Sequence, residues 1–264
     1  MTVCYLCGEP VDEGAGSGDH VIPRTLLGDR PPKVKGFDYG GRVRAHLECN
    51  NRFGDETYVR KALQLLGALH DSRTTLTRPA PDRLKGHVLA LNETMLPGFS
   101  RRDLRFFGIY DARNDTMARF DDPEFYTGKP RADLRRTALC TSLSVLAKSA
   151  AALLVSRHLA ELPGSWNIVC IPYAGDATEV DLSAFFGETK PFAPDIRVWT
   201  KKFEAGSWTS IYVTGTAMAW FFFLMDKDRS LVEGIRERFP REPCLRFLGK
   251  SLMDLVGHDW PPEG

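Results

Sequence analysis

The sequence predicts an α+β protein with a small N-terminal module and a larger second domain. Three observations support this. Short-spaced cysteine and histidine pairs gather in the first fifty residues, a polar stretch with Pro79 and Pro81 follows, and a long apolar helical segment then precedes several strand-like runs. We therefore expect a module at residues 1–70, a linker at 71–85 and an α+β domain at 86–264, with one antiparallel sheet packed on the long helix.

The N-terminal module carries two pairs of candidate metal ligands. Cys4 and Cys7 form one pair, and His46 and Cys49 form a second pair at the same spacing. Four nitrogen and sulfur ligands suit tetrahedral Zn²⁺, and a site filled by four protein ligands is structural. Because so small a module has little core, zinc would supply much of its folding free energy. The thirty-eight residues between the pairs exceed what a zinc ribbon needs, so we expect a further feature there.

That gap contains the sequence DHVIPR at residues 19–24, directly after the glycine-rich GAGSG. Val21 and Ile22, stopped by Pro23, indicate a short hairpin strand that holds the preceding histidine. Adjacent residues of a strand point to opposite faces. Asp19 and His20 therefore need a bulge or turn to aim at one point, and the glycines would permit it.

The motifs CYLC, DHVIPR and HLECNNRFG, in this order, resemble the HNH endonucleases of the ββα-metal fold, in the subgroup with a structural zinc. The resemblance covers residues 4–56. It implies a ββα unit that hydrolyses nucleic-acid phosphodiester bonds and leaves a 5′ phosphate and a 3′ hydroxyl. The family's middle asparagine is absent, since GGRVRA occupies residues 40–45, and this affects the expected loop geometry more than the chemistry.

The resemblance also assigns roles to particular residues. His20 would be the general base that takes a proton from the attacking water. Asp19 and Asn50 would be oxygen ligands of a catalytic Mg²⁺ or Mn²⁺, which stabilises the leaving 3′ oxygen. We expect Asn50 at the start of a helix that follows Cys49 and extends to about residue 70. The alternative ion ligands are Asn51, Asp55 and Glu56.

The charge balance gives no sign of a nucleic-acid partner, because 35 Lys and Arg face 34 Asp and Glu. Any attraction to phosphate must come from local patches. Double-stranded DNA is the expected partner, with RNA as the alternative that one sequence does not separate. The candidate backbone contacts are Arg24, Arg42, Arg44 and Arg52, although an arginine in such a position is more often a solvated or salt-bridged surface residue.

The second domain shows strand and helix patterns but no catalytic motif. Its long helix is expected to turn one apolar side to the core. The expected elements are strands at 86–91, 104–110 and 117–120 around a turn at 113–115, a helix at 134–159, strands at 166–173, 196–203, 208–214 and 217–225, and short helices at 229–239 and 244–256.

Compartment and partners follow from the same sequence. Cys140, Cys170 and Cys244 are scattered singly, which favours a reducing cytoplasm. No signal peptide opens the chain, and the apolar run at 217–225 is too short to span a bilayer, so no membrane partner is expected. The second domain would recognise DNA or receive a small-molecule or protein activator, as in bacterial restriction and phage-defence proteins of this layout. A homodimer would be needed to cut both strands at once.

A different class of function also fits the zinc motif. The module would then be a non-catalytic, zinc-dependent element that binds nucleic acid or protein. Asp19 and His20 argue against this alternative, because a purely structural zinc module has no need of them.

Overall fold

In a computed structural model, the described part of the chain is mixed α/β with antiparallel sheets, as predicted. The structure describes residues 3–12, 14, 16–23, 41–53, 59, 108–111, 116–119, 132–174, 190–193, 196–202, 207–213, 218–224, 229–238, 240 and 243–262.

The N-terminal module is built on a two-stranded antiparallel ribbon. Strand β1 (Gly16–His20) pairs with β2 (Arg42–His46). The register is regular from Gly16 opposite His46 to His20 opposite Arg42, so the bulge that we expected at Asp19 and His20 is absent from the ribbon. Because strand residues alternate between faces, Asp19 lies on the buried face and His20 on the other.

Helix α1 (Leu47–Arg52) follows β2 directly, with His46 as its N-cap. The helix therefore begins three residues earlier than predicted, and Asn50 lies inside it, not at its start. This early start places Cys49 beside His46, because residues three apart on a helix share a face. The described helix ends before Phe53, and residues 54–58 and 60–70 of the predicted helix lie outside the described residues.

The main sheet has six antiparallel strands in the order β11-β6-β10-β9-β8-β7. Four of its strands fall where the sequence predicts them, and β7 was not predicted. The bounds are β6 (Trp166–Ala174), β7 (Lys190–Ala193), β8 (Ile196–Lys202), β9 (Ser207–Val213), β10 (Met218–Leu224) and β11 (Leu245–Gly249).

A smaller sheet has the order β4-β3-β5. Strand β3 (Gly108–Asp111) pairs antiparallel with β4 (Thr116–Arg119), which confirms the predicted strand pairing. Strand β5 (Ala132–Asp133) leads into the long helix α5 (Leu134–Arg157), and α7 (Ser230–Arg238) is the predicted helix near residue 230. The strand predicted at 86–91 and the turn at 113–115 lie outside the described residues.

The helix predicted at 244–256 is wrong. This segment forms the edge strand β11 and the 3₁₀ helix η5 (Leu252–Leu255). Leu245 and Phe247 are buried, whereas Leu248 is 64% exposed. Burial at every second residue is the pattern of a half-buried strand.

Helix α5 is buried on nearly all sides instead of presenting one apolar side. From Ser142 to Leu154 every residue is buried, including three serines and a lysine. By length and composition alone, its segment Leu139–Arg157 could cross a membrane. The prediction from sequence considered only the shorter apolar run at 217–225 and did not consider this segment. Because 78% of its apolar window is buried inside the protein, a central core helix accounts for the same composition.

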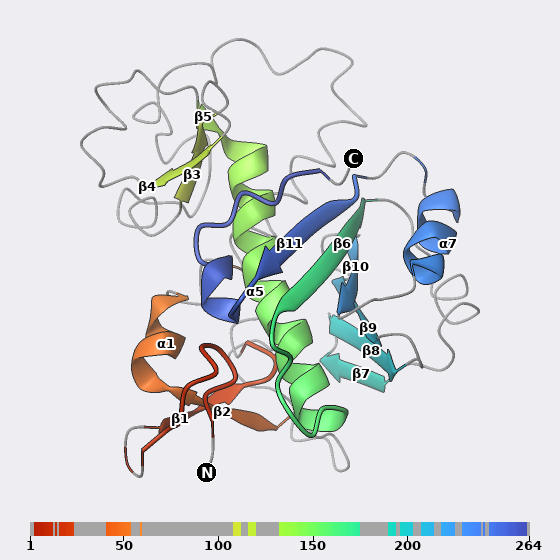
Figure 1. The fold of residues 1–264 in the computed structure, drawn as a ribbon. Coiled ribbons are helices and arrows are strands. Elements are labelled where there is room, and N and C mark those ends of the chain that lie inside the picture. Colours follow the sequence, from red (N-terminus) through yellow and green to blue (C-terminus); the bar gives the residue numbers. More distant parts are fainter. Residues whose placement is uncertain are drawn as a thin grey trace.

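The hydrophobic core is continuous across the described parts of the predicted domains. Buried residues of the N-terminal module, of α5 and of the main sheet belong to one cluster. In Figure 1, α5 runs between the red and orange N-terminal hairpin and the blue-green sheet. The C-terminal segment reaches the module as well, since the backbone N–H of Met253 donates to the carbonyl of Leu6 at 3.3 Å. The predicted linker at 71–85 lies outside the described residues.

Candidate metal centre and the adjoining polar cluster

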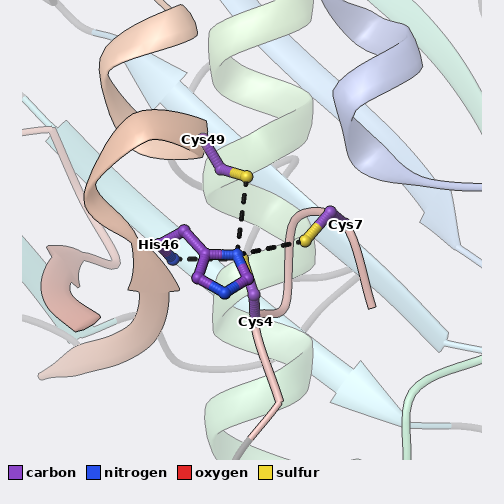
Figure 2. Close-up of side chains that lie close together, drawn as sticks. All are labelled: Cys4, Cys7, His46 and Cys49. Carbon is purple, nitrogen blue, oxygen red and sulfur yellow. Dashed lines mark hydrogen bonds between the residues drawn. The ribbon is translucent and has the colours of Figure 1, made fainter. Parts of the chain in front are cut away.

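The four predicted zinc ligands converge. The ligand atoms of Cys4, Cys7, His46 and Cys49 all lie within 4.8 Å of one another. Figure 2 shows the four side chains gathered at one place. Zn–S bonds of about 2.3 Å and Zn–N bonds of about 2.0 Å fit inside a cluster of that size. Three thiols and an imidazole are also the donor set that zinc prefers, so the cluster is compatible with a structural zinc.

The loop that carries Cys4 and Cys7 is shaped by backbone hydrogen bonds. The N–H of Gly8 donates to the carbonyl of Cys4, and the N–H of Cys4 donates to the carbonyl of Glu9, each at 2.8 Å. Gly8 has φ +81°, a left-handed conformation that glycine adopts without steric strain. The backbone N–H of His46 donates to the Cys4 sulfur at 3.2 Å.

A hydrogen bond at Nε2 orients the ring of His46. Nε2 lies 3.0 Å from the carbonyl oxygen of Pro10, and a carbonyl only accepts, so Nε2 carries the proton. In the neutral ring Nδ1 is then the unprotonated nitrogen, and it faces the sulfurs of Cys7 and Cys49 at 3.3 and 3.8 Å. A histidine ligand needs this tautomer, with its other nitrogen bonded to a carbonyl.

The thiols of Cys7 and Cys49 hold their protons firmly while no metal is bound. Burial, reinforced by the neighbouring thiols, raises the pKa of Cys49 to about 12. Burial also raises the pKa of Cys7. Zinc binds thiolates, so its binding must expel these protons.

The fold and this cluster together define a mixed α/β protein with a Cys₃His cluster near its N-terminus that could hold a metal ion such as zinc. Comparison with family models, with curated proteins and with solved structures gives no match, so function has to be argued from the site itself.

A second, polar cluster adjoins the metal centre and contains two predicted site residues. Nζ of Lys148, on α5, lies 2.9 Å from Oδ2 of Asp19 and donates to Oδ1 of Asn50 at 2.9 Å. Asp19 and Lys148 are only 2% and 3% exposed. The structure thus brings Asp19 and Asn50 to one point, and a lysine ammonium lies at that point.

Further contacts enclose this cluster. The hydroxyl of Tyr5 donates to Oδ2 of Asp19 at 2.5 Å, and Nζ of Lys148 lies 5.0 Å from the centre of the Phe53 ring. The hydroxyl of Ser149 donates to the carbonyl of Val21 at 2.7 Å, which ties α5 to the end of β1. The carboxylate is therefore paired and hydrogen-bonded, as a buried charge must be.

His20 lies on the opposite, more exposed face of the ribbon. It is half-buried and stands directly across from Arg42, and Arg44 occupies the same face. A Cβ added at Gly18 would come within 2.8 Å of the Arg42 side chain, and one at Gly16 within 2.8 Å of Arg44. The glycines of β1 therefore leave room for two arginines to lie across the strand.

The structure describes only some of the remaining predicted DNA contacts and alternative ion ligands. Arg52 and Asn51 are exposed on α1. Arg24, Asp55 and Glu56 lie outside the described residues.

Sequence reasoning missed Tyr5, Lys148 and Ser149. One signal for Lys148 was present: a lysine in the middle of a strongly apolar helix needs a buried partner of opposite charge. Which acid it would meet was not visible, since Asp19 is 129 positions away in sequence. Tyr5 and Ser149 carry no comparable signal.

Proposed function

We propose that the N-terminal module is an HNH endonuclease unit of the ββα-metal type, which hydrolyses phosphodiester bonds in nucleic acid. One observation carries the proposal. The carboxylate of Asp19 and the amide of Asn50, one from a strand and one from a helix, direct oxygens at a single cation position. The order β1, β2, α1 and the Cys₃His cluster support the same interpretation.

His20 is the proposed general base. An imidazole is suited to accept a proton from water near neutral pH. Arg42 and Arg44 share its face of the ribbon, where guanidinium groups would hold phosphate oxygens while the water is positioned. Duplex DNA is the proposed substrate, because its two backbones offer phosphates to such a face.

The donor set of Asp19 and Asn50 fits a hard divalent ion such as Mg²⁺ or Mn²⁺, since both side chains offer oxygen. Such an ion, when bound, would neutralise the charge that develops on the leaving oxygen. The space between the two oxygens, however, is filled by the Lys148 ammonium. Ion binding therefore requires a rearrangement of this cluster. Regular pairing also places Asp19 and His20 on opposite faces of the ribbon, so the proposed catalysis requires β1 to leave this register as well.

The proposal is tested by incubating the zinc-loaded full chain with 5′-labelled duplex DNA and, separately, with RNA of the same sequence, each with Mg²⁺ or Mn²⁺. We expect cleavage of the DNA and fragments with a 5′ phosphate and a 3′ hydroxyl. Cyclic phosphate ends on RNA would overturn the proposed chemistry, because they arise from attack by the 2′ hydroxyl and not by water.

A second candidate function is a non-catalytic, zinc-dependent module that binds nucleic acid or protein. The buried Asp19–Lys148 pair favours it, because ionic pairing gives Asp19 a structural role that needs no divalent ion. The same experiment separates the two candidates: DNA binding without cleavage, under both metals, would favour the binding module.

The wider setting rests on the sequence. We propose the second domain as the source of recognition or of regulation by an activator, in a cytoplasmic restriction or phage-defence effector. Double-strand cleavage would then require a homodimer or two encounters with the duplex.

A further inference from the structure

The oxygens that the proposed function reserves for a divalent ion are already bound to a cation of the chain itself. Nζ of Lys148 lies 2.9 Å from both Oδ2 of Asp19 and Oδ1 of Asn50. We infer that Lys148 competes with the divalent ion for these two oxygens, so that the site holds either the ammonium or the ion. This inference deepens the proposed function and rests on it for the identity of the competing ion.

Both the limited space and the electrostatic repulsion prevent the Lys148 ammonium and the divalent ion from occupying the site together. A Mg²⁺ or Mn²⁺ ion bound at about 2.1 Å from both oxygens would lie against the ammonium nitrogen. Asp19 and Lys148 are nearly inaccessible to water, at 2% and 3% exposure. At such a place little solvent screens the repulsion between the two positive charges.

The ammonium is also well held where it is. The face of the Phe53 ring lies near it, and the Tyr5 hydroxyl bonds the same carboxylate oxygen. The next residue, Ser149, fixes the helix backbone to β1 through the Val21 carbonyl. Releasing the two oxygens therefore requires either a new side-chain conformation of Lys148 or a shift of α5 relative to β1.

Because Lys148 lies on α5, movement of this helix would regulate binding of the divalent ion. The helix packs on β2 at the module and on β9 and β10 of the main sheet, and Figure 1 shows it between them. Anything that moves α5 relative to β1 would move the lysine relative to the two oxygens. A ligand of the second domain would thus control ion binding without touching the ion site.

Mn²⁺ binding to the zinc-loaded full chain tests the inference, with free Mn²⁺ counted by electron paramagnetic resonance. Lys148→Gln and Lys148→Met remove the charge. The matched control Ser156→Ala removes a hydroxyl that bonds within α5 and keeps both the ammonium and the Ser149 bond to Val21. We expect each Lys148 variant to bind one Mn²⁺ at least about tenfold more tightly than wild type, an increase abolished by adding Asn50→Ala, and no increase in Ser156→Ala.

The inference would be overturned by an unchanged Mn²⁺ affinity in either Lys148→Gln or Lys148→Met, measured on zinc-loaded, folded protein, because the ammonium would then offer no competition for the two oxygens. Failure of the proposed function has a different signature: a Lys148 variant that gains Mn²⁺ but cleaves neither DNA nor RNA would retain the competition and refute the nuclease.

Discussion

The ammonium of Lys148 and the carboxylate of Asp19 form a buried ion pair at 2.9 Å that joins the central helix α5 to strand β1 of the N-terminal module. The pair is part of a set that includes Tyr5 and Asn50, so each charge also has hydrogen-bonding partners. The residue that the sequence predicts as an ion ligand is therefore a structural contact between distant parts of the chain.

Removing the cation of this pair should destabilise the protein strongly. Lys148→Met leaves the carboxylate of Asp19 buried without its counter-charge, and we expect a loss of about 3–5 kcal/mol in the free energy of unfolding. Urea denaturation of zinc-loaded protein measures it. The double variant Asp19→Asn/Lys148→Met should recover part of the loss, because no unpaired charge is left. A loss below about 1 kcal/mol in Lys148→Met would mean that the pair is not buried in solution.

The hydrogen bond beside the pair should contribute less. Ser149→Ala leaves the carbonyl of Val21 without the hydroxyl that now donates to it at 2.7 Å. The expected loss is about 1–3 kcal/mol in the same denaturation experiment. Ser156→Ala is the control, because that hydroxyl bonds within its own helix near the exposed end of α5. Equal effects of both substitutions would contradict a special contact between α5 and β1.

Zinc binding should require all four ligands of the cluster. Cys49→Ser and His46→Ala should lose bound zinc and lower the midpoint of thermal unfolding, since a metal that binds only the folded module stabilises it. His46→Cys should retain zinc, because four thiolates also form a tetrahedral site. Metal analysis of protein purified in reductant gives the content. Full zinc occupancy in Cys49→Ser would contradict the assignment.

The affinity for zinc should fall as the pH falls. Burial raises the pKa of Cys49 to about 12 and raises that of Cys7, so both thiols are protonated at neutral pH before metal binds. Each such thiol releases one proton to the solvent on binding, so each contributes about one decade of apparent affinity per pH unit. Competition with a chelator of known pH dependence between about pH 6 and 8 measures the slope. A pH-independent affinity would contradict thiolate coordination.

The arginines on the His20 face should contribute to DNA binding through charge. Arg42→Gln and Arg44→Gln should each weaken binding equally across sequences and reduce the slope of log affinity against log salt concentration by about 0.9. Arg236→Gln on α7, an exposed arginine in another part of the fold, is the matched control. If the salt slope fell by the same amount in all three variants, the result would contradict DNA binding at the His20 face.

The sequence predicted local structure well where a side-chain pattern specifies it. The spacing of Cys4, Cys7, His46 and Cys49 predicted their convergence, because two short-spaced pairs can hold one ion. Alternating and continuous apolar runs predicted most strands and α5. The helix predicted at 244–256 failed because apolar residues there are spaced ambiguously, and pairing with β6 decides in favour of a strand.

Long-range contacts decide what sequence patterns left open. The glycines before Asp19 permitted a bulge, but regular pairing with β2 puts Asp19 and His20 on opposite faces. The position of Lys148 between Asp19 and Asn50 depends on how α5 docks on the module. No local pattern encodes that docking, because it arises from packing of α5 against segments that are distant in the sequence.

The most direct test of the central claim is nicking of supercoiled plasmid by zinc-loaded wild type, Lys148→Gln and His20→Ala, each with Mg²⁺, with Mn²⁺ and with EDTA. Zinc content is measured in every sample, so that loss of the fold is not mistaken for loss of catalysis. We predict metal-dependent nicking that falls at least about 100-fold in zinc-loaded His20→Ala. Nicking that persists in His20→Ala, or no cleavage of DNA by either wild type or Lys148→Gln, would contradict the account.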